Sequence, residues 1–165
     1  MEHICTLIAV RDIEKAKQFY MSVLGLEVIS DFGANVILTG GVSLQTIETW
    51  KNFIRKTEDE IILGSRAYEL YFEEDDLDAY AAKLVQFDHI EYVHPMIEHS
   101  WGQRAIRFYD PDQHIIEVGE SIHKVIIRFL DSGLTLQQTA ARMDVPLSYI
   151  ENHIDSNALK SKSLN

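Results

Sequence analysis

The stretch that decides the fold is Ala105-Ile-Arg-Phe-Tyr-Asp-Pro-Asp-Gln-His-Ile-Ile-Glu-Val-Gly-Glu120, whose pattern predicts two strands joined by a tight turn. The turn is Asp110-Pro-Asp-Gln113, because proline presets φ at the second turn position and aspartate side chains hydrogen-bond nearby backbone. β-Branched and aromatic residues flank the turn on both sides. Glu117 interrupts the second apolar run, where a carboxylate without a partner is costly. Glu117 is therefore a candidate site residue.

Composition indicates a soluble globular protein. The 165 residues suit one domain of roughly 120 residues with an appendage. The formal net charge of −11 disfavours nucleic acid and anionic membrane surfaces as partners. No apolar run approaches the ~18–20 residues of a membrane helix, and the N-terminus does not have the pattern of a signal peptide, so we expect a cytoplasmic protein. Cys5 is the single cysteine, which excludes an intramolecular disulfide.

The chain contains one structural unit twice. In the first copy, a strand at 4–10 precedes a helix that begins after Asp12 and ends at Gly25, and three short strands follow. In the second copy, a strand at 68–72 precedes a helix capped by Asp76, and three strands follow again. This internal repeat predicts an α+β fold built from two βαβββ modules.

Two segments carry a family resemblance. VRDIEKAKQFYMSVLGLEV at 10–28 and FYDPDQHIIEVGE at 108–120 resemble the glyoxalase, bleomycin-resistance and dioxygenase family, also called the vicinal oxygen chelate superfamily. The resemblance implies that the two modules form a curved mixed sheet around a pocket. It also implies homodimers and, in many members, a divalent metal held by the first and fourth strands of each module. We assign residues 2–120 to this domain.

The metal positions of the family fall on four residues here, which are Cys5, Gln45, Glu69 and Glu117. Neither first-strand position is a histidine, although His3 lies two residues from Cys5 and would share its face of the strand. A cysteine is a soft ligand and fits poorly with an oxygen-rich set, which argues against a conventional metal site.

Two carboxylates facing one pocket allow two chemistries. With a divalent cation, Glu69 and Glu117 become hard oxygen ligands, and Gln45 could add an amide oxygen. Without a metal, their mutual repulsion would leave one proton shared between them, an acid/base pair suited to proton abstraction beside a carbonyl. Alternatively, both glutamates pair with Arg104 or Arg107 and line an inert pocket.

The segment 94–104 is predicted to be a loop, because it contains Pro95 and Gly102 and is longer than its counterpart in the first copy. Loops on a rigid scaffold often carry recognition, and an aromatic face with polar neighbours suits a small ligand. The candidate substrate-binding residues are Tyr71, Trp101, Gln103 and Arg104. The alternative is a surface loop pinned by a buried Trp101.

The rest of the chain is predicted to be helical. We expect a helical extension over 121–155, with helices near 121–130, 134–143 and 147–154, and a flexible tail at 156–165. The last two helices resemble a helix-turn-helix pair. The would-be reading helix has no lysine or arginine and contains Glu151, so docking on the body or on a second subunit is favoured over DNA.

Two functions follow from these observations. The first is a lyase or isomerase acting on a small carbonyl or thiol-adduct metabolite, with Glu69 and Glu117 as metal ligands or as the acid/base pair. The second is a metal-free protein of the bleomycin-resistance type that sequesters a small molecule between Trp101 and the carboxylates. In both, the partner is a small molecule and the expected assembly is a homodimer, without nucleic acid or membrane. A divalent metal is the one cofactor considered.

Overall fold

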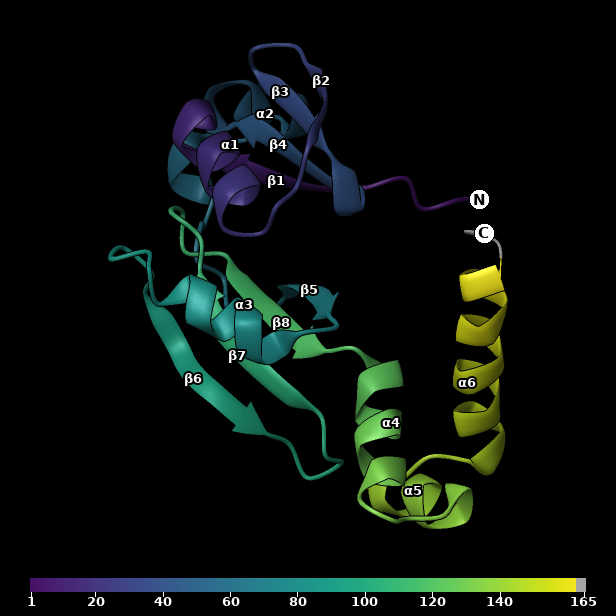
Figure 1. Cartoon of the computed structure of the whole chain (residues 1–165). Coiled ribbons are helices and arrows are strands. Elements are labelled where there is room, and N and C mark those ends of the chain that lie inside the picture. Colours follow the sequence, from purple (N-terminus) through teal and green to yellow (C-terminus); the bar gives the residue numbers. More distant parts are fainter. Residues whose placement is uncertain (163–165) are drawn as a thin grey trace. The chain divides into compact units, whose positions relative to one another are not determined.

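The computed structural model describes the backbone of residues 1–162 and the side chains of residues 1–154. Within that part, the first copy folds into β1 (Thr6–Val10), α1 (Ile13–Ser22), β2 (Val28–Asp31), β3 (Asn35–Leu38) and β4 (Val42–Thr46). The second copy folds into β5 (Glu69–Glu74), α3 (Leu77–Leu84), β6 (Tyr92–Glu98), β7 (Arg104–Tyr109) and β8 (Ile115–Glu120). The remaining helices are α2 (Ile47–Ile54), α4 (Ile122–Asp131), α5 (Leu136–Met143) and α6 (Leu147–Lys162), with short 3-10 turns at Thr39–Gly41 and Glu58–Glu60 (Figure 1).

The two copies have the same strand order. The sheets run β1-β4-β3-β2 and β5-β8-β7-β6, so the first strand of each copy pairs with its fourth. In the first sheet β1 and β4 are parallel while β2, β3 and β4 are antiparallel. The predicted α+β fold of two βαβββ modules is confirmed. By contacts the chain forms two compact units, the first made of Met1–Leu70, Phe87–Val93 and Phe108–Ile116, and the second of Tyr71–Gln86, His94–Arg107 and Glu117–Asn165.

Both predicted helix starts are confirmed by their caps. The Asp12 carboxylate accepts a hydrogen bond from the Lys15 backbone N–H at 3.0 Å, and the Asp76 carboxylate accepts one from Ala79 at 3.0 Å. Each bond satisfies one of the unpaired N–H groups in the first turn of a helix. At the other end of α1, Gly25 has a φ of 71°, the left-handed conformation expected for a glycine that ends a helix.

The predicted loop over 94–104 is wrong in its first half. Residues up to Glu98 belong to β6, in which His94 and Met96 are half-buried and their neighbours are exposed. Pro95 had indicated a loop, but β6 is the edge strand of its sheet. A proline on an edge strand can leave its missing N–H on the unpaired side, so it does not break the ladder. Only 99–103 lies outside the strands.

One buried carboxylate holds the turn of the second copy to the first helix. The Asp110 Oδ1 atom accepts the backbone N–H groups of Asp112 (2.9 Å) and His114 (2.8 Å). Its Oδ2 atom accepts the Tyr20 hydroxyl (2.9 Å) and His114 Nδ1 (2.8 Å). Burial raises the pKa of Tyr20 well above its usual value, so the phenol keeps the proton it donates. The neighbouring Asp112 accepts the Arg11 backbone N–H and guanidinium.

The helices α4, α5 and α6 share a small apolar core. Its buried members are Val125, Ile126, Phe129, Ala140, Met143 and Ile150. The hairpin between β6 and β7 receives this extension, because Gly102 lies against the Phe129 ring and a Cβ at Gly102 would overlap it. Arg142 donates to the Ser100 carbonyl and to Glu98. The extension therefore packs on the second module of its own chain, one of the two kinds of docking that the sequence favoured over DNA binding.

Glu120 is the electrostatic centre of this docking. Its side chain is 4% exposed and accepts hydrogen bonds from the guanidinium groups of Arg104 and Arg128 at 2.9–3.2 Å. Burial alone would raise the pKa of Glu120, but the two arginines outweigh burial and leave that pKa below its ordinary value of 4.5. Glu120 therefore remains charged although it is enclosed.

No helix in the described part of the chain is both long enough and apolar enough to span a bilayer. The helix predicted to end near 154 continues as α6 to Lys162. The flexible tail expected at 156–165 concerns residues whose side chains, and at 163–165 whose backbone, lie outside the described part.

Replacing Asp110 by Asn should lower the free energy of unfolding by about 3 kcal/mol. The new amide NH₂ group would face two donors, the Tyr20 hydroxyl and the His114 ring N–H. Asp12→Asn is the matched control, since asparagine caps a helix about as well as aspartate. Urea unfolding of both variants measures the difference, and equal losses would contradict the role given to Asp110.

Glu120→Gln should cost about 2 kcal/mol of stability near neutral pH, because it removes the charge shared by two arginines. The folded-state pKa of Glu120 lies below its unfolded value of 4.5, so the stabilisation is complete above 4.5 and is lost as pH falls through the folded pKa. The gap between wild type and variant should therefore shrink below pH 4.5. Urea titrations across this range test it, with the exposed Glu14→Gln as a control expected to change little.

Candidate functional site

One face of the second sheet gathers polar and aromatic side chains, and we call it the Arg107 face. Alternation along β7 and β8 places Gln103 and Arg107 on one side, together with Glu117 and Gly119. Two contacts extend the face across the sheet: Tyr71 of β5 reaches Gln103, and His94 of β6 reaches Arg107. Its members, which all belong to the second unit, are Tyr71, His94, Gln103, Arg107, Glu117 and Gly119.

A chain of hydrogen bonds joins three of the four predicted substrate-binding residues. The Trp101 indole N–H donates to Gln103 Oε1 at 3.3 Å, and Gln103 Nε2 donates to the Tyr71 hydroxyl at 2.8 Å and to the Glu120 carbonyl at 2.9 Å. The Tyr71 hydroxyl in turn donates to Glu73 at 3.0 Å. Burial raises the pKa of Tyr71 to about 12, with Gln103 lowering it and Glu73 raising it further. Tyr71 therefore remains a neutral donor at physiological pH.

Trp101 is fixed on one face and open on the other. Its ring stacks on the His99 ring, with centroids 4.3 Å apart and planes 7° from parallel. The residue nevertheless remains 40% exposed. The sequence left open whether Trp101 is a buried pin or a recognition surface. The stacked but accessible ring is suited to contacting a flat ligand.

Arg107 is the polar centre of the face. Its guanidinium forms an ion pair with the buried Glu117 carboxylate and lies 3.2 Å from the Nε2 atoms of both His94 and His99. His94 Nδ1 lies 2.8 Å from the Pro95 carbonyl, which can only accept, so Nδ1 carries the ring proton and Nε2 accepts from Arg107. Glu117 thus has an internal cation as its partner, one of the alternatives that the sequence allowed.

Sequence reasoning missed the two histidines of this cluster and gave Arg107 only a structural role. His94 and His99 have no metal-ligand spacing, and in the structure the Nε2 atoms of both lie 3.2 Å from the Arg107 guanidinium. The available signal concerned Arg107 alone, because a period of two along the strand places it on the same side as Gln103.

Arg104 lies on the opposite side of the sheet from Gln103. Its guanidinium contacts Glu120 and, at 3.1 Å, Asp78 of α3. One residue along a strand reverses the direction of the side chain. Of the four predicted substrate-binding residues, Arg104 is thus the one that the structure does not join to the others.

The first-copy positions of the predicted metal site lie far apart. The register of β1 and β4 pairs Ala9 with Gln45 and Thr6 with Val42. Cys5 therefore precedes the partner of Gln45 by four residues, which is roughly 13 Å along a strand. Ligands of one ion lie within a few ångströms of it. The exposed His3 lies two residues further away.

Gln45 is also committed to internal contacts. It is 3% exposed, its Oε1 accepts from Asn35 Nδ2 at 3.0 Å, and its Nε2 donates to the Ala34 carbonyl at 3.0 Å and to the Thr49 hydroxyl. A metal bound to the Gln45 amide oxygen would compete with the Asn35 donor. These contacts give Gln45 a structural role in its sheet.

The two predicted carboxylates have different surroundings. Glu69 opens β5 and is exposed in the first unit, whereas Glu117 is buried in the second unit. Their convergence on one ion or proton stays a prediction. Within the described residues, no three or more His, Cys, Asp and Glu side chains gather as a metal would need.

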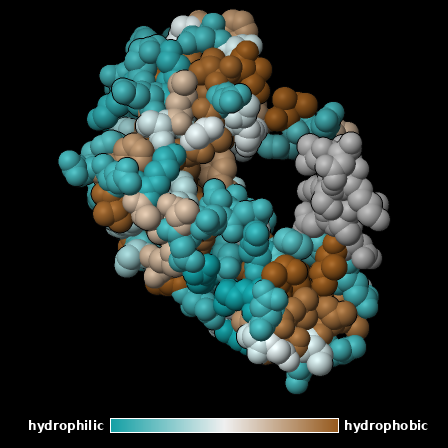
Figure 2. All heavy atoms as spheres, viewed as in Figure 1, coloured by the Kyte–Doolittle hydropathy of each residue, from teal (hydrophilic) through white to brown (hydrophobic). Residues whose placement is uncertain are grey.

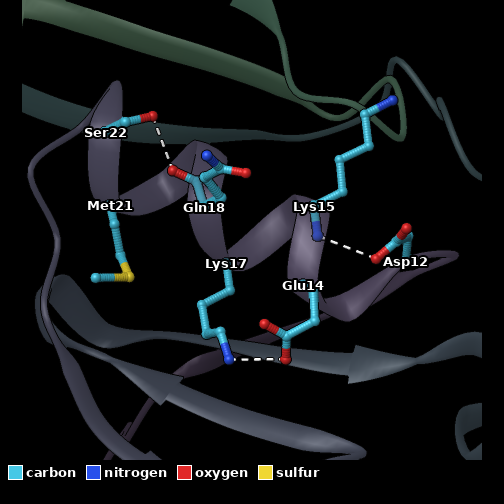
Figure 3. Close-up of a pocket in the computed structure, with 7 residues that line it drawn as sticks. All are labelled: Asp12, Glu14, Lys15, Lys17, Gln18, Met21 and Ser22. Carbon is cyan, nitrogen blue, oxygen red and sulfur yellow. Dashed lines mark hydrogen bonds and ion pairs between the residues drawn. The ribbon is translucent and has the colours of Figure 1, made fainter.

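A hollow of about 630 Å³ lies along α1 and is lined by this helix and its cap (Figure 3). Its charges are already paired, since Lys17 contacts Glu14 and Asp31 at 2.8 Å and Asp12 caps the helix. One helix surface supplies few convergent polar groups for a ligand. We therefore place the candidate site on the Arg107 face and the adjoining Trp101, and not on α1.

Comparison with known proteins agrees with this architecture. A glyoxalase-like domain model matches residues 3–123. The chain therefore belongs to the glyoxalase-like domain family. Comparison with curated proteins gave no match.

Solved structures show the same fold. A protein of unknown function from Agrobacterium tumefaciens is 38% identical, with a TM-score of 0.66 over 74% of this chain and 95% of that one. A glyoxalase/bleomycin resistance protein/dioxygenase family enzyme from Burkholderia phytofirmans is 15% identical, with a TM-score of 0.64 over 74% and 100%. A glyoxalase-related enzyme from Fulvimarina pelagi is 13% identical, with a TM-score of 0.63 over 73% and 88%.

Gly119→Ala should break the Trp101–Gln103–Tyr71 chain. The added Cβ would stand 3.0 Å from both Gln103 Nε2 and the Tyr71 ring, closer than ordinary contact. We expect a loss of about 1–2 kcal/mol in stability and a shifted indole N–H resonance for Trp101. Trp50, the other tryptophan, serves as the internal control in the same NMR spectrum. An unmoved Trp101 signal would show that the chain does not depend on this close packing.

Proposed function

We propose that this glyoxalase-like chain binds a small organic molecule without a metal ion. The observation that carries the proposal is the ion pair between Arg107 and Glu117. A buried carboxylate needs a counter-charge, and here a guanidinium of the same unit supplies it. The side chain at the fourth-strand position of the second module is therefore neutralised from within the protein.

Three of the four side chains at the family's metal positions argue against a divalent cation. A divalent cation at Glu117 would face the positive charge of Arg107, and removing one partner of a buried pair is costly. The Gln45 amide is bonded to its own sheet, and Cys5 is a soft ligand set apart from Gln45 by the strand register. Glu117, Gln45 and Cys5 therefore fit a divalent metal poorly.

The ion pair with Arg107 also argues against Glu69 and Glu117 as an acid/base pair. A general base must take up and release a proton within hydrogen-bond reach of its substrate. A guanidinium beside Glu117 favours the charged carboxylate, which works against a proton shared with Glu69. The pairing therefore supports binding over lyase or isomerase chemistry.

Two exposed aromatic side chains suit ligand contact, Tyr71 on the Arg107 face and Trp101 beside it. Trp101 presents an accessible ring, the exposed Tyr71 adds a second ring with a hydroxyl, and the buried Gln103 joins the two through hydrogen bonds. Small-molecule sites typically combine apolar and aromatic walls with a few fixed polar groups. In this proposal the rigid hydrogen-bonded chain keeps Trp101 ready to receive a ligand.

Metal analysis of the purified protein tests the proposal. We expect well under one divalent ion per chain after exposure to zinc, nickel, manganese or magnesium salts, and no metal-dependent rise in melting temperature. Glu117→Gln should lower stability by about 3 kcal/mol, because it leaves Arg107 without its counter-charge. Glu14→Gln, at an exposed pair, is the control.

The opposite result is equally clear. The proposal would be overturned if the wild type bound one divalent ion per chain, Glu117→Gln lost that ion and Glu14→Gln kept it. That result would favour the metal-dependent enzyme.

A further inference from the structure

A groove of about 520 Å³ lies where the β6–β7 hairpin meets the C-terminal extension. The hairpin contributes Ser100 and Trp101, and the extension contributes residues from α4, the end of α5 and the start of α6. We call it the Trp101 groove. Its volume lies in the range of roughly 300–1,000 Å³ that small-molecule sites occupy.

The walls of the Trp101 groove are aromatic and aliphatic. Trp101 stands on the hairpin side and Tyr149 on the α6 side, and both line the same space. Three aliphatic side chains complete the lining: Ile122, Met143 and Val145. Figure 2 shows apolar atoms at the surface over the extension, in the lower right of the view. Two aromatic side chains over an aliphatic lining favour a flat, unsaturated ligand.

Both aromatic walls are held in place. Trp101 is stacked on His99 and hydrogen-bonded to Gln103. The Tyr149 ring packs on His153 with centroids 4.2 Å apart, and its backbone N–H donates to the Pro146 carbonyl at 2.9 Å. Side chains that are already ordered lose little further entropy when a ligand binds.

The described lining has no excess positive charge that would attract an anion. Arg142 is the one cation among the described lining residues, and its guanidinium already contacts Glu98 and the Ser100 carbonyl. Asp144, at the left-handed cap of α5, places an acidic residue in the same lining. The chain as a whole carries a net charge of −11. A neutral or cationic ligand is therefore favoured over an anionic one.

The wall opposite Trp101 lies almost wholly outside the family domain. The glyoxalase-like match ends at residue 123, whereas Arg142, Met143 and Tyr149 belong to the extension. The extension is anchored to the hairpin through Arg142 and through Phe129 packed on Gly102. The groove is thus a feature that this chain adds to the shared fold.

We infer that the Trp101 groove is the ligand site of this protein and that it takes a planar aromatic molecule, neutral or cationic, held between Trp101 and Tyr149. The inference rests on the proposed metal-free binding function and names where binding occurs. In it, the C-terminal extension is a wall of the binding site as well as a structural appendage.

Calorimetric titration of the full chain with three flat, three-ring aromatic compounds tests the inference. Proflavine supplies a planar cation, acridine a neutral ring system and anthracene carboxylate an anion. We expect one molecule of proflavine or acridine per chain, with anthracene carboxylate at least about tenfold weaker. Failure of both proflavine and acridine to bind would overturn the inference.

Variants locate the binding. Tyr149→Ala and Trp101→Ala should each weaken proflavine or acridine about tenfold, the size of one lost aromatic contact. Val145→Trp, which fills the groove and keeps both rings, should also weaken binding. Trp50→Phe in α2 is the matched control and should leave affinity unchanged. Thermal unfolding of each variant checks that the extension remains folded.

The outcomes separate this inference from the proposed function. Proflavine or acridine binding that all three groove variants leave unchanged would overturn the groove while leaving metal-free binding intact. Stoichiometric metal that depends on Glu117 would overturn the proposed function whatever the three compounds do.

Discussion

The buried carboxylate of Asp110 is the constraint on which the fold depends. It accepts two backbone N–H groups of its own turn, the Tyr20 hydroxyl and His114 Nδ1. Because Tyr20 lies on the helix of the first copy and Asp110 on the last turn of the second, this hydrogen-bonded group joins the two repeats. Both oxygens of this buried carboxylate accept hydrogen bonds. Few other arrangements of the chain would satisfy it, so it favours this fold over alternatives as well as stabilising it.

The same rule explains the candidate site. Glu117 is buried inside a strand, where its charge must be compensated. Here Arg107, on the neighbouring strand β7, supplies the compensating charge and also contacts His94 and His99. The fold alone does not fix the function, which depends on the side chains placed at such positions.

The extension adds a second layer to this scaffold. Glu120, Arg104 and Arg128 join the sheet to α4, and the absence of a side chain at Gly102 lets the Phe129 ring approach the hairpin. The helix-turn-helix pattern thus serves packing in this chain, with α5 and the start of α6 facing Trp101 across a groove. The homodimer implied by the family stays a prediction.

The sequence by itself determined the repeat, both helix caps and the membership of the family, because these depend on local signals such as Asp12, Asp76 and Gly25 and on the periodicity of apolar residues. It also named Trp101, Gln103 and Tyr71 as candidate ligand contacts, the first two because they lie in a segment predicted to be a recognition loop. Only the tertiary structure decided that Pro95 lies on an edge strand, that Cys5 and Gln45 are four register positions apart, and that Arg107 neutralises Glu117. Such pairings join residues distant in the chain, and a side chain's partner depends on strand order and register, which local sequence patterns do not encode.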